Sequence, residues 1–294
     1  RPLPLLAAVC LLLALAWPAA ADPDALRLQS PEAVGIGLPF QIRISSEVDF
    51  GAVRITWLQR TVELPLQADG DRFAATLLLG SDVKSQEPGK RTLRVQAEKF
   101  GINRELKRTI RLQKREFPVQ RLSLPKRMVT LSQETLKRYK KEKKQVQSVL
   151  SSFTGERFWK CPFQRPAQGE VSSRYGLRRI LNGKPRSPHR GLDLRTGAGA
   201  KVKACNHGRV QLTDNHYFSG RSVYIDHGRG MVSMYFHLSE IFVHPGQKVS
   251  RGKVIGRTGK TGRATGPHLH FGVSLLGQLV DPAFLLEQSC PYYQ

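Results

Sequence analysis

Apolar and polar residues alternate in short runs over the first third of the chain. Within these runs apolar side chains occupy every second position, and Gly, Asp and Pro residues separate one run from the next. A period of two is typical of strands that bury one face. The pattern therefore predicts a mostly β protein with an N-terminal antiparallel β-sandwich over residues 22–113, which we interpret as an accessory module for binding or spacing. The clearest predicted strands are residues 40–45, 53–58, 72–79, 92–97 and 106–112.

A helical pattern follows the sandwich. The segment "KREFPVQRLSLP" contains two prolines and is predicted to be extended. Beyond Ser132, a favourable N-cap, apolar residues recur at the three- and four-residue spacing of an amphipathic helix. These apolar residues are Leu136, Tyr139, Val146, Val149, Leu150 and Phe153. We therefore predict a basic linker with one helix over residues 114–155, followed by a second, glycine-rich β domain over residues 156–294.

The first residues follow neither pattern. Arg1 precedes an apolar run from Leu3 to Trp17, and the small residues Ala19 and Ala21 come just before an acidic position. This arrangement is typical of a secretory signal peptide, here residues 1–21, and the apolar run is short for a membrane span. A membrane anchor is the alternative. We expect an exported protein of the periplasm or cell envelope with no transmembrane span in the mature chain.

Export changes the interpretation of the cysteines. Cys161, Cys205 and Cys290 lie far apart without a C-x-x-C spacing, which disfavours a cysteine-based zinc cluster. In an oxidising compartment we expect one disulfide and one buried thiol. Because Cys161 and Cys290 bracket the second domain, and domain ends commonly lie close together, we predict that these two pair and that Cys205 stays free.

The chain is strongly basic, with a formal net charge of +24, and therefore needs an acidic partner or surface. Residues 114–144 alone contain eleven Lys or Arg against three Glu. In an intracellular protein this would indicate nucleic acid. For an exported protein we expect contacts of the basic linker with anionic envelope polymers or lipid headgroups, and no nucleic acid. The alternative is that these charges only keep the helix soluble.

Candidate chemistry lies in two short segments of the second domain. In "SPHRGLDLRTG", His189 and Asp193 share one face of an extended chain, and Gly191 leaves room between them. In "PHLHF", His268 and His270 share a strand face. Two imidazoles and a carboxylate are typical zinc ligands, and three protein ligands leave a fourth position open, as in catalytic sites. The spacing alone does not separate a metal site from histidines without a role.

The surrounding motifs are more specific. Between residues 170 and 285 the chain contains, in order, H-x-x-x-D, I-D-H-G, Y-x-H-L, "VHPGQKVSRG", G-x-T-G and G-P-H-L-H-F. This ordered set resembles, almost end to end, the lysostaphin-type or LytM-type zinc metalloendopeptidases. The resemblance implies an antiparallel β-sheet peptidase domain with a cleft and one Zn²⁺ per chain. It assigns His189, Asp193 and His270 as metal ligands, and His237 and His268 as the catalytic pair.

The same resemblance implies hydrolysis of peptide bonds in peptidoglycan cross-links or stem peptides, for cell-wall remodelling. The predicted sandwich is similar to the accessory module that precedes this peptidase in some envelope proteins. One alternative is a non-catalytic LytM-type activator of another wall hydrolase, although such domains lose ligands or catalytic histidines and this chain has all five. Another is a basic protein that binds anionic envelope polymers or extracellular DNA, which would leave the histidines without a role.

The other four histidines receive smaller roles. We expect His227 to pack or hydrogen bond near a strand end, and we expect His207, His216 and His244 in surface loops. The glycines of "GKTGRATG" are predicted to shape a turn at the border of the cleft.

Overall fold

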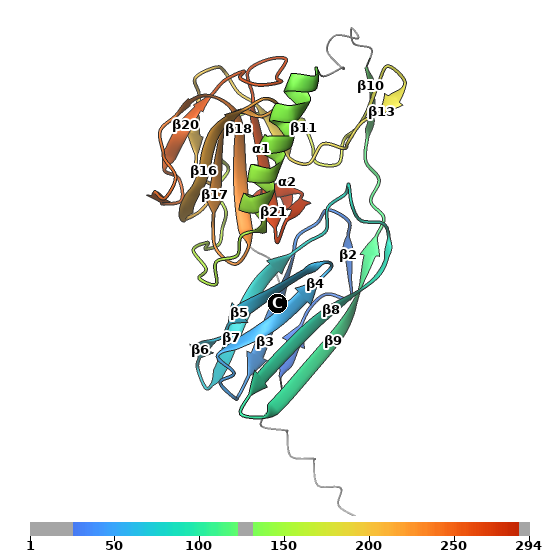
Figure 1. Ribbon diagram of the computed structural model, residues 1–294, viewed down its shortest axis with the longest axis vertical. Coiled ribbons are helices and arrows are strands. Elements are labelled where there is room, and N and C mark those ends of the chain that lie inside the picture. The colour runs from blue at the N-terminus through green and yellow to red at the C-terminus, as the bar shows by residue number, and fades with distance from the viewer. Residues whose placement is uncertain (1–25, 123–131, 288–294) are drawn as a thin grey trace, which may run out of the picture.

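The computed structural model describes residues 26–122 and 132–287 and is mostly β (Figure 1). A β-sandwich forms one end of the molecule and a ten-stranded sheet forms the other. None of the helices in these two ranges is long and apolar enough to cross a membrane. The predicted signal peptide lies outside the described residues.

The N-terminal part is the predicted sandwich of two sheets. The four-stranded sheet has the order β1 (Arg27–Gln29), β3 (Phe40–Ser46), β7 (Arg72–Leu79), β6 (Gln67–Asp69). The five-stranded sheet has the order β2 (Ala33–Gly35), β9 (Ile102–Gln113), β8 (Gly89–Lys99), β4 (Ala52–Trp57), β5 (Arg60–Pro65). Alternate residues of both sheets, such as Ile42 and Ile55, are fully buried between them.

One strand pairing of the sandwich differs from the antiparallel prediction. β2 pairs with β9 in parallel, whereas all other pairs of the sandwich are antiparallel. The two strands are far apart in the sequence, so no tight hairpin forces them to run in opposite directions.

The C-terminal part is one ten-stranded sheet. Its main path has the order β11 (Glu170–Ser173), β14 (Leu192–Arg195), β21 (Leu269–Leu275), β18 (Met231–Ile241), β17 (Gly220–Asp226), β16 (Gly208–His216), β19 (Lys248–Val249). Three further strands extend it, namely β15 (Lys201–Lys203), β20 (Val254–Thr258) and β22 (Gln278–Val280). All pairs in this sheet are antiparallel, as predicted.

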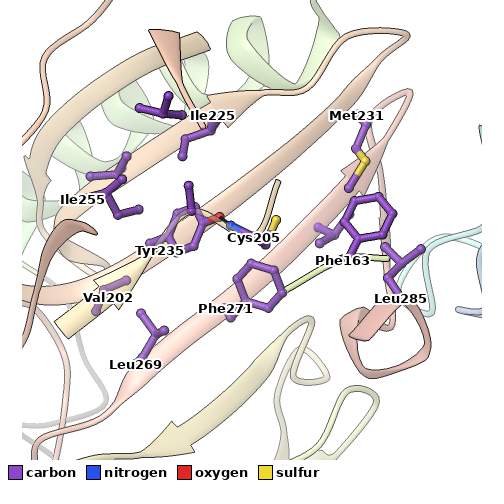
Figure 2. Close-up of a cluster of buried hydrophobic side chains, with 14 of the residues drawn as sticks. Phe163, Val202, Cys205, Ile225, Met231, Tyr235, Ile255, Leu269, Phe271 and Leu285 are labelled. Carbon is purple, nitrogen blue, oxygen red and sulfur yellow. Dashed lines mark hydrogen bonds between the residues drawn. The ribbon is translucent and has the colours of Figure 1, made fainter. Parts of the chain in front are cut away.

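The two faces of this sheet have different coverings. One face packs on a large apolar core that includes Ile225, Tyr235 and Phe271, with the short helix α2 (Pro282–Glu287) at its edge (Figure 2). On the other face Tyr224, Val232 and Met234 pack against the linker helix. Because side chains alternate along β18 and β21, Phe236 and His270 belong to this second face.

The linker is tied to the C-terminal sheet region. Its first part forms β10 (Val119–Leu122), which pairs in parallel with β12 (Arg178–Leu181), and β12 pairs with β13 (Lys184–Pro185). The helix α1 (Gln133–Ser151) begins as predicted, because the Ser132 side chain accepts a hydrogen bond from the Thr135 N–H at 3.1 Å. Leu136 is 41 % exposed, so the face that packs on the sheet begins one turn later than its periodicity indicates.

Direct contacts join the sandwich to the ten-stranded sheet. The Tyr175 hydroxyl donates to the Leu279 carbonyl at 2.7 Å and accepts from the Val83 N–H at 3.0 Å. Arg190 forms an ion pair with Asp82 at 3.0 Å. The division of the chain at residues 113 and 155 into separate domains stays a prediction.

Candidate metal centre and catalytic histidines

The three predicted metal ligands converge on one point. Asp193 of β14 and His270 of β21 are partners in the strand register, and their Oδ1 and Nδ1 atoms lie 2.8 Å apart. His189 comes just before β14, and its Nε2 atom lies 3.0 Å from both of these atoms. The part of the chain that the structure describes contains no other group of three His, Cys, Asp or Glu side chains with this convergence.

Backbone contacts fix the orientation of His189. Its N–H donates to the Leu177 carbonyl at 2.9 Å, which holds the segment extended as predicted, although His189 itself lies outside a strand. Its Nδ1 lies 3.0 Å from the Arg174 carbonyl oxygen. Since a carbonyl only accepts, Nδ1 carries the proton and the Nε2 lone pair points toward Asp193 and His270.

The site is electrostatically suited to a cation. His189 and Asp193 are buried, with 9 % and 7 % of their surfaces exposed. Burial raises the pKa of the Asp193 carboxyl, but the adjacent imidazoles of His189 and His270 outweigh it and hold that pKa well below its usual range. Burial lowers the pKa of the His270 imidazole. The cluster therefore contains a carboxylate whose charge needs compensation.

Gly191 provides the space for the third ligand. A Cβ atom at this position would lie 2.6 Å from Nε2 of His270 and 2.7 Å from the Phe271 carbonyl oxygen. The room that the sequence predicts between His189 and Asp193 is therefore filled by the His270 ring. The Phe236 ring stacks on this imidazole with a centroid distance of 5.2 Å and an interplanar angle of 7°.

His237 lies next to this cluster in an unusual backbone conformation. Its φ is 65°, in the left-handed region that residues with a side chain rarely adopt. The register of β17 against β18 shifts between Arg221 and Val223, so β18 has one extra residue there. Such a bulge redirects side chains, and here the ring of His237 comes to 6.3 Å from the ring of His270.

Two hydrogen bonds hold His237 in this conformation. Its N–H donates to the Ser219 carbonyl at 2.8 Å. Its Nδ1 lies 2.9 Å from the Thr261 carbonyl oxygen and so donates to it. Burial lowers the pKa of the His237 imidazole to about 4, so the ring is neutral with an unprotonated Nε2 near neutral pH.

His268 has the same kind of support. It forms an isolated bridge with Gly259, just before β21, and its Nδ1 lies 2.9 Å from the Gly266 carbonyl oxygen. The rings of His268 and His237 have a centroid distance of 4.7 Å. All five histidine and aspartate residues that the sequence singles out thus lie together.

The backbone carbonyls that orient the histidines were not predicted. The segment "GKTGRATG" was expected to shape a turn, and it supplies the acceptors at Thr261 and Gly266. The signal for this role lies in the same glycines. A Cβ at Gly262 would lie 2.3 Å from the Gly220 nitrogen, so the loop approaches the β16–β17 turn closely only without a side chain there.

Expectations for the other residues are met in part. His227 is fully buried at a strand end and hydrogen bonds to the Ser233 hydroxyl at 2.7 Å, as predicted. His216, predicted in a surface loop, is 4 % exposed at the end of β16 and lies against α1.

Cys205 is a free, buried thiol, as predicted. Cys161 is disulfide-bonded, and because Cys290 lies outside the described residues their pairing stays a prediction.

Comparison with known proteins places this geometry in a family. Residues 187–282 match the model of Peptidase family M23. A crystal structure from Pseudomonas aeruginosa described as an M23 peptidase is similar, with 30% identity and a TM-score of 0.63 over 80% of this chain and 88% of that one. The fold and site are thus those of a β-sheet peptidase. The chain belongs to peptidase family M23.

Two relatives from Vibrio cholerae are named as peptidoglycan DD-endopeptidases. ShyA is 42% identical over 123 residues, which are 40% of this chain and 29% of ShyA. ShyB is 42% identical over 94 residues, which are 32% of this chain and 22% of ShyB. The chain therefore spans less than a third of the length of either relative.

Proposed function

We propose that this chain is an exported zinc metalloendopeptidase that hydrolyses peptide bonds in peptidoglycan cross-links or stem peptides. The observation that carries the proposal is the convergence of His189 Nε2, Asp193 Oδ1 and His270 Nδ1 within 3.0 Å of one another, beside the close pair His237 and His268. The names of the ShyA and ShyB relatives support the substrate class.

The donor set fits zinc. Two imidazole nitrogens and one carboxylate oxygen are ordinary zinc ligands, and three of them leave a position for water or substrate. Ligand atoms at about 2.1 Å from a tetrahedral ion are roughly 3.4 Å apart, slightly more than the 2.8 Å and 3.0 Å separations here. A bound zinc ion would supply a water with a pKa near neutrality and would polarise the scissile carbonyl.

The remaining chemistry belongs to His237 and His268. Each Nδ1 donates to a backbone carbonyl, which leaves each Nε2 free to accept or return a proton. We assign them jointly to proton transfer: one Nε2 accepts the proton of the nucleophilic water, and a protonated Nε2 donates to the leaving amine nitrogen. Once an Nε2 has accepted the proton, it can also donate a hydrogen bond to the developing oxyanion.

The test is mass spectrometry of the muropeptides that the purified chain releases from sacculi of defined cross-link type. We expect cross-linked or stem peptides to be shortened by cleavage of an amide bond, with loss of activity in chelator and recovery on zinc addition. His237→Ala and His268→Ala serve as inactive controls. A fully zinc-loaded protein that releases no fragment, yet stimulates another wall hydrolase, would contradict catalysis and support the activator alternative.

Export to the periplasm or cell envelope is part of the same proposal, because that is where the proposed substrate lies. The lysines of α1 support a contact of the basic linker with anionic envelope polymers or lipid headgroups. Lys137, Lys140, Lys141 and Lys144 are exposed on α1, and like charges at three- and four-residue spacing destabilise an isolated helix unless an anion compensates them. Cell fractionation of the full-length chain tests the location.

A further inference from the structure

One long edge of the sandwich lacks a strand partner. β8 pairs with β9 over Ile102 to Leu112, whereas on the other side of β9 the strand β2 reaches only Arg111 to Gln113. The Arg111 N–H points to this side, because it donates to the Glu32 carbonyl at 2.8 Å. In an antiparallel pair the outward-pointing backbone groups belong to alternate residues, so those of Thr109 and Lys107 point the same way. In the described chain no strand meets them.

A hollow of about 820 Å³ follows this edge. β9 and β8 contribute Lys107, Arg108, Arg111 and Lys90 to its lining, and the segment between β1 and β2 contributes Ser30 and Glu32. The hollow therefore leaves room for an extended ligand beside the outward-pointing backbone groups of Lys107 and Thr109.

The charge of the hollow is unbalanced. Within the described residues, Lys107 forms an ion pair with Glu105 at 2.8 Å, while Lys90, Arg108 and Arg111 have no carboxylate within 4.0 Å. Lys90 and Arg111 stand directly opposite each other in the strand register. Like charges at opposed positions destabilise a sheet, and an anionic ligand between them would remove that cost.

We propose that the β9 edge binds an extended acidic segment of another protein, which adds to the sheet as a strand. The backbone of this segment would pair with Lys107 and Thr109, and its carboxylates would meet Lys90 and Arg111, whose side chains share one face of the sheet. Acidic residues at alternate positions suit such a strand, since side chains on one face recur every second residue. The same cations repel a second copy of this basic edge, which excludes self-pairing as the occupant. This site lies on the sandwich and does not rest on the proposed peptidase activity.

The test measures binding of the full-length protein to a fluorescent peptide of alternating Glu and Thr. Three competitors define the mode of binding: the same sequence with Gln for Glu, the same peptide with alternate backbone nitrogens methylated, and inorganic polyphosphate. We expect the Gln peptide and the N-methylated peptide to bind at least 10-fold more weakly than the parent. A polyphosphate that competes while the N-methylated peptide retains full affinity would overturn strand addition and identify a plain polyanion site.

Two variants locate the site. The double variant Lys90→Glu and Arg111→Glu should weaken peptide binding at least 10-fold. Thr109→Pro removes one edge N–H without removing charge, is compatible with an edge strand, and should have a similar effect. The double variant Lys248→Glu and Lys253→Glu, an equal charge reversal at exposed positions of the C-terminal part, is the matched control and should leave binding unchanged. Equal weakening by this control, or full affinity of Thr109→Pro, would overturn the proposal. Circular dichroism and thermal unfolding on the same preparations verify that each variant is folded.

Discussion

Asp193 and His270 face each other across two neighbouring strands, with Oδ1 and Nδ1 2.8 Å apart. Their position follows from the register of β14 against β21, so the sheet itself brings together two of the three proposed ligand atoms. A slip of one residue would turn either side chain to the opposite face and bury it in the apolar core. The site is therefore as rigid as the centre of the sheet.

The first prediction concerns His189 and Asp193. His189→Ala and Asp193→Ala should each lose zinc and hydrolytic activity together, because each removes one of the three proposed protein ligands. Zinc content by atomic emission and hydrolysis rate should be measured on one preparation. Near-stoichiometric zinc with unchanged affinity in both variants would contradict the assignment.

The second prediction concerns Gly191. Gly191→Ala places a methyl group 2.6 Å from the His270 ring and 2.7 Å from the Phe271 carbonyl oxygen, so the ligand must move. We expect zinc affinity to fall by about 10–100-fold, as when the support of a metal ligand is disturbed. Gly197→Ala, at a position with no atom within 4 Å, is the matched control. A zinc titration that gives the same affinity for both variants would show that the space at Gly191 is not needed.

The sequence predicted elements where a single physical pattern dominates. The alternating runs of β3, β4, β7, β8 and β9 are such cases, and so is the Ser132 N-cap of α1. Strands of three residues such as β1, β2 and β6 are too short to show a period of two, and they form only because long neighbours offer an open edge. β5 was also missed, although its Val62 and Leu64 alternate with polar residues.

The sequence predicted which side chains form the candidate site. It did not predict the backbone groups and conformations that orient them. The types and spacing of His189, Asp193 and His270 are visible in the sequence. The Thr261 carbonyl reaches His237 from a loop 24 residues later in the chain, and the left-handed conformation of His237 accompanies a bulge in the pairing of β17 with β18; no local pattern encodes either feature. His216 was misplaced for a similar reason, because its burial comes from contact with a helix some seventy residues earlier.

The third prediction concerns stability against pH. His227 is fully buried, and burial lowers the pKa of its imidazole from 6.5 to about 4. The unfolded chain therefore binds this proton at higher pH than the folded chain does, so stability is lost as pH falls from about 6.5 to about 4. The slope from this group is about 1.4 kcal/mol per pH unit.

Urea unfolding of the wild type and of His227→Gln between pH 4 and pH 7 measures this contribution. The variant should be less stable at pH 7, because the bonds to the Ser233 hydroxyl and the His207 carbonyl are disturbed. Its stability should also fall less steeply as the pH is lowered. Parallel curves for the two proteins would show that His227 does not titrate in this range.

The fourth prediction concerns the linker helix. Both carboxylate oxygens of Glu142 accept the Tyr217 N–H, at 3.0 Å and 3.1 Å, and so hold the β16–β17 turn to α1. That turn includes Ser219, whose carbonyl accepts the His237 N–H at 2.8 Å. Glu142→Gln should therefore let His237, the proposed catalytic histidine, shift and lower kcat by roughly 10-fold, because small misplacements of catalytic groups are costly.

Zinc content and KM should stay near the wild-type values in Glu142→Gln, since Glu142 hydrogen bonds to Arg138 and Tyr217 and not to the three proposed ligands. Lys141→Gln, the adjacent exposed position on α1, is the control and should leave kcat unchanged. A fall in zinc content, or an equal loss in Lys141→Gln, would indicate a general loss of structure in place of a shift of His237.

The fifth prediction separates His268 from His270, two residues apart in the sequence. His270→Ala removes a proposed ligand, so zinc should dissociate readily and thermal stability should fall with it. His268→Ala leaves His189, Asp193 and His270 in place and removes a proton carrier. Turnover should then fall by about 10²–10⁴-fold while zinc content stays near wild type.

His237→Ala should behave as His268→Ala does, because both rings use Nδ1 to bind a backbone carbonyl and leave Nε2 free. Zinc content and hydrolysis rate on the same purified preparations decide the question. If His268→Ala loses zinc as completely as His270→Ala, both histidines are ligands of a closed four-ligand site, and the catalytic role given to His268 is wrong.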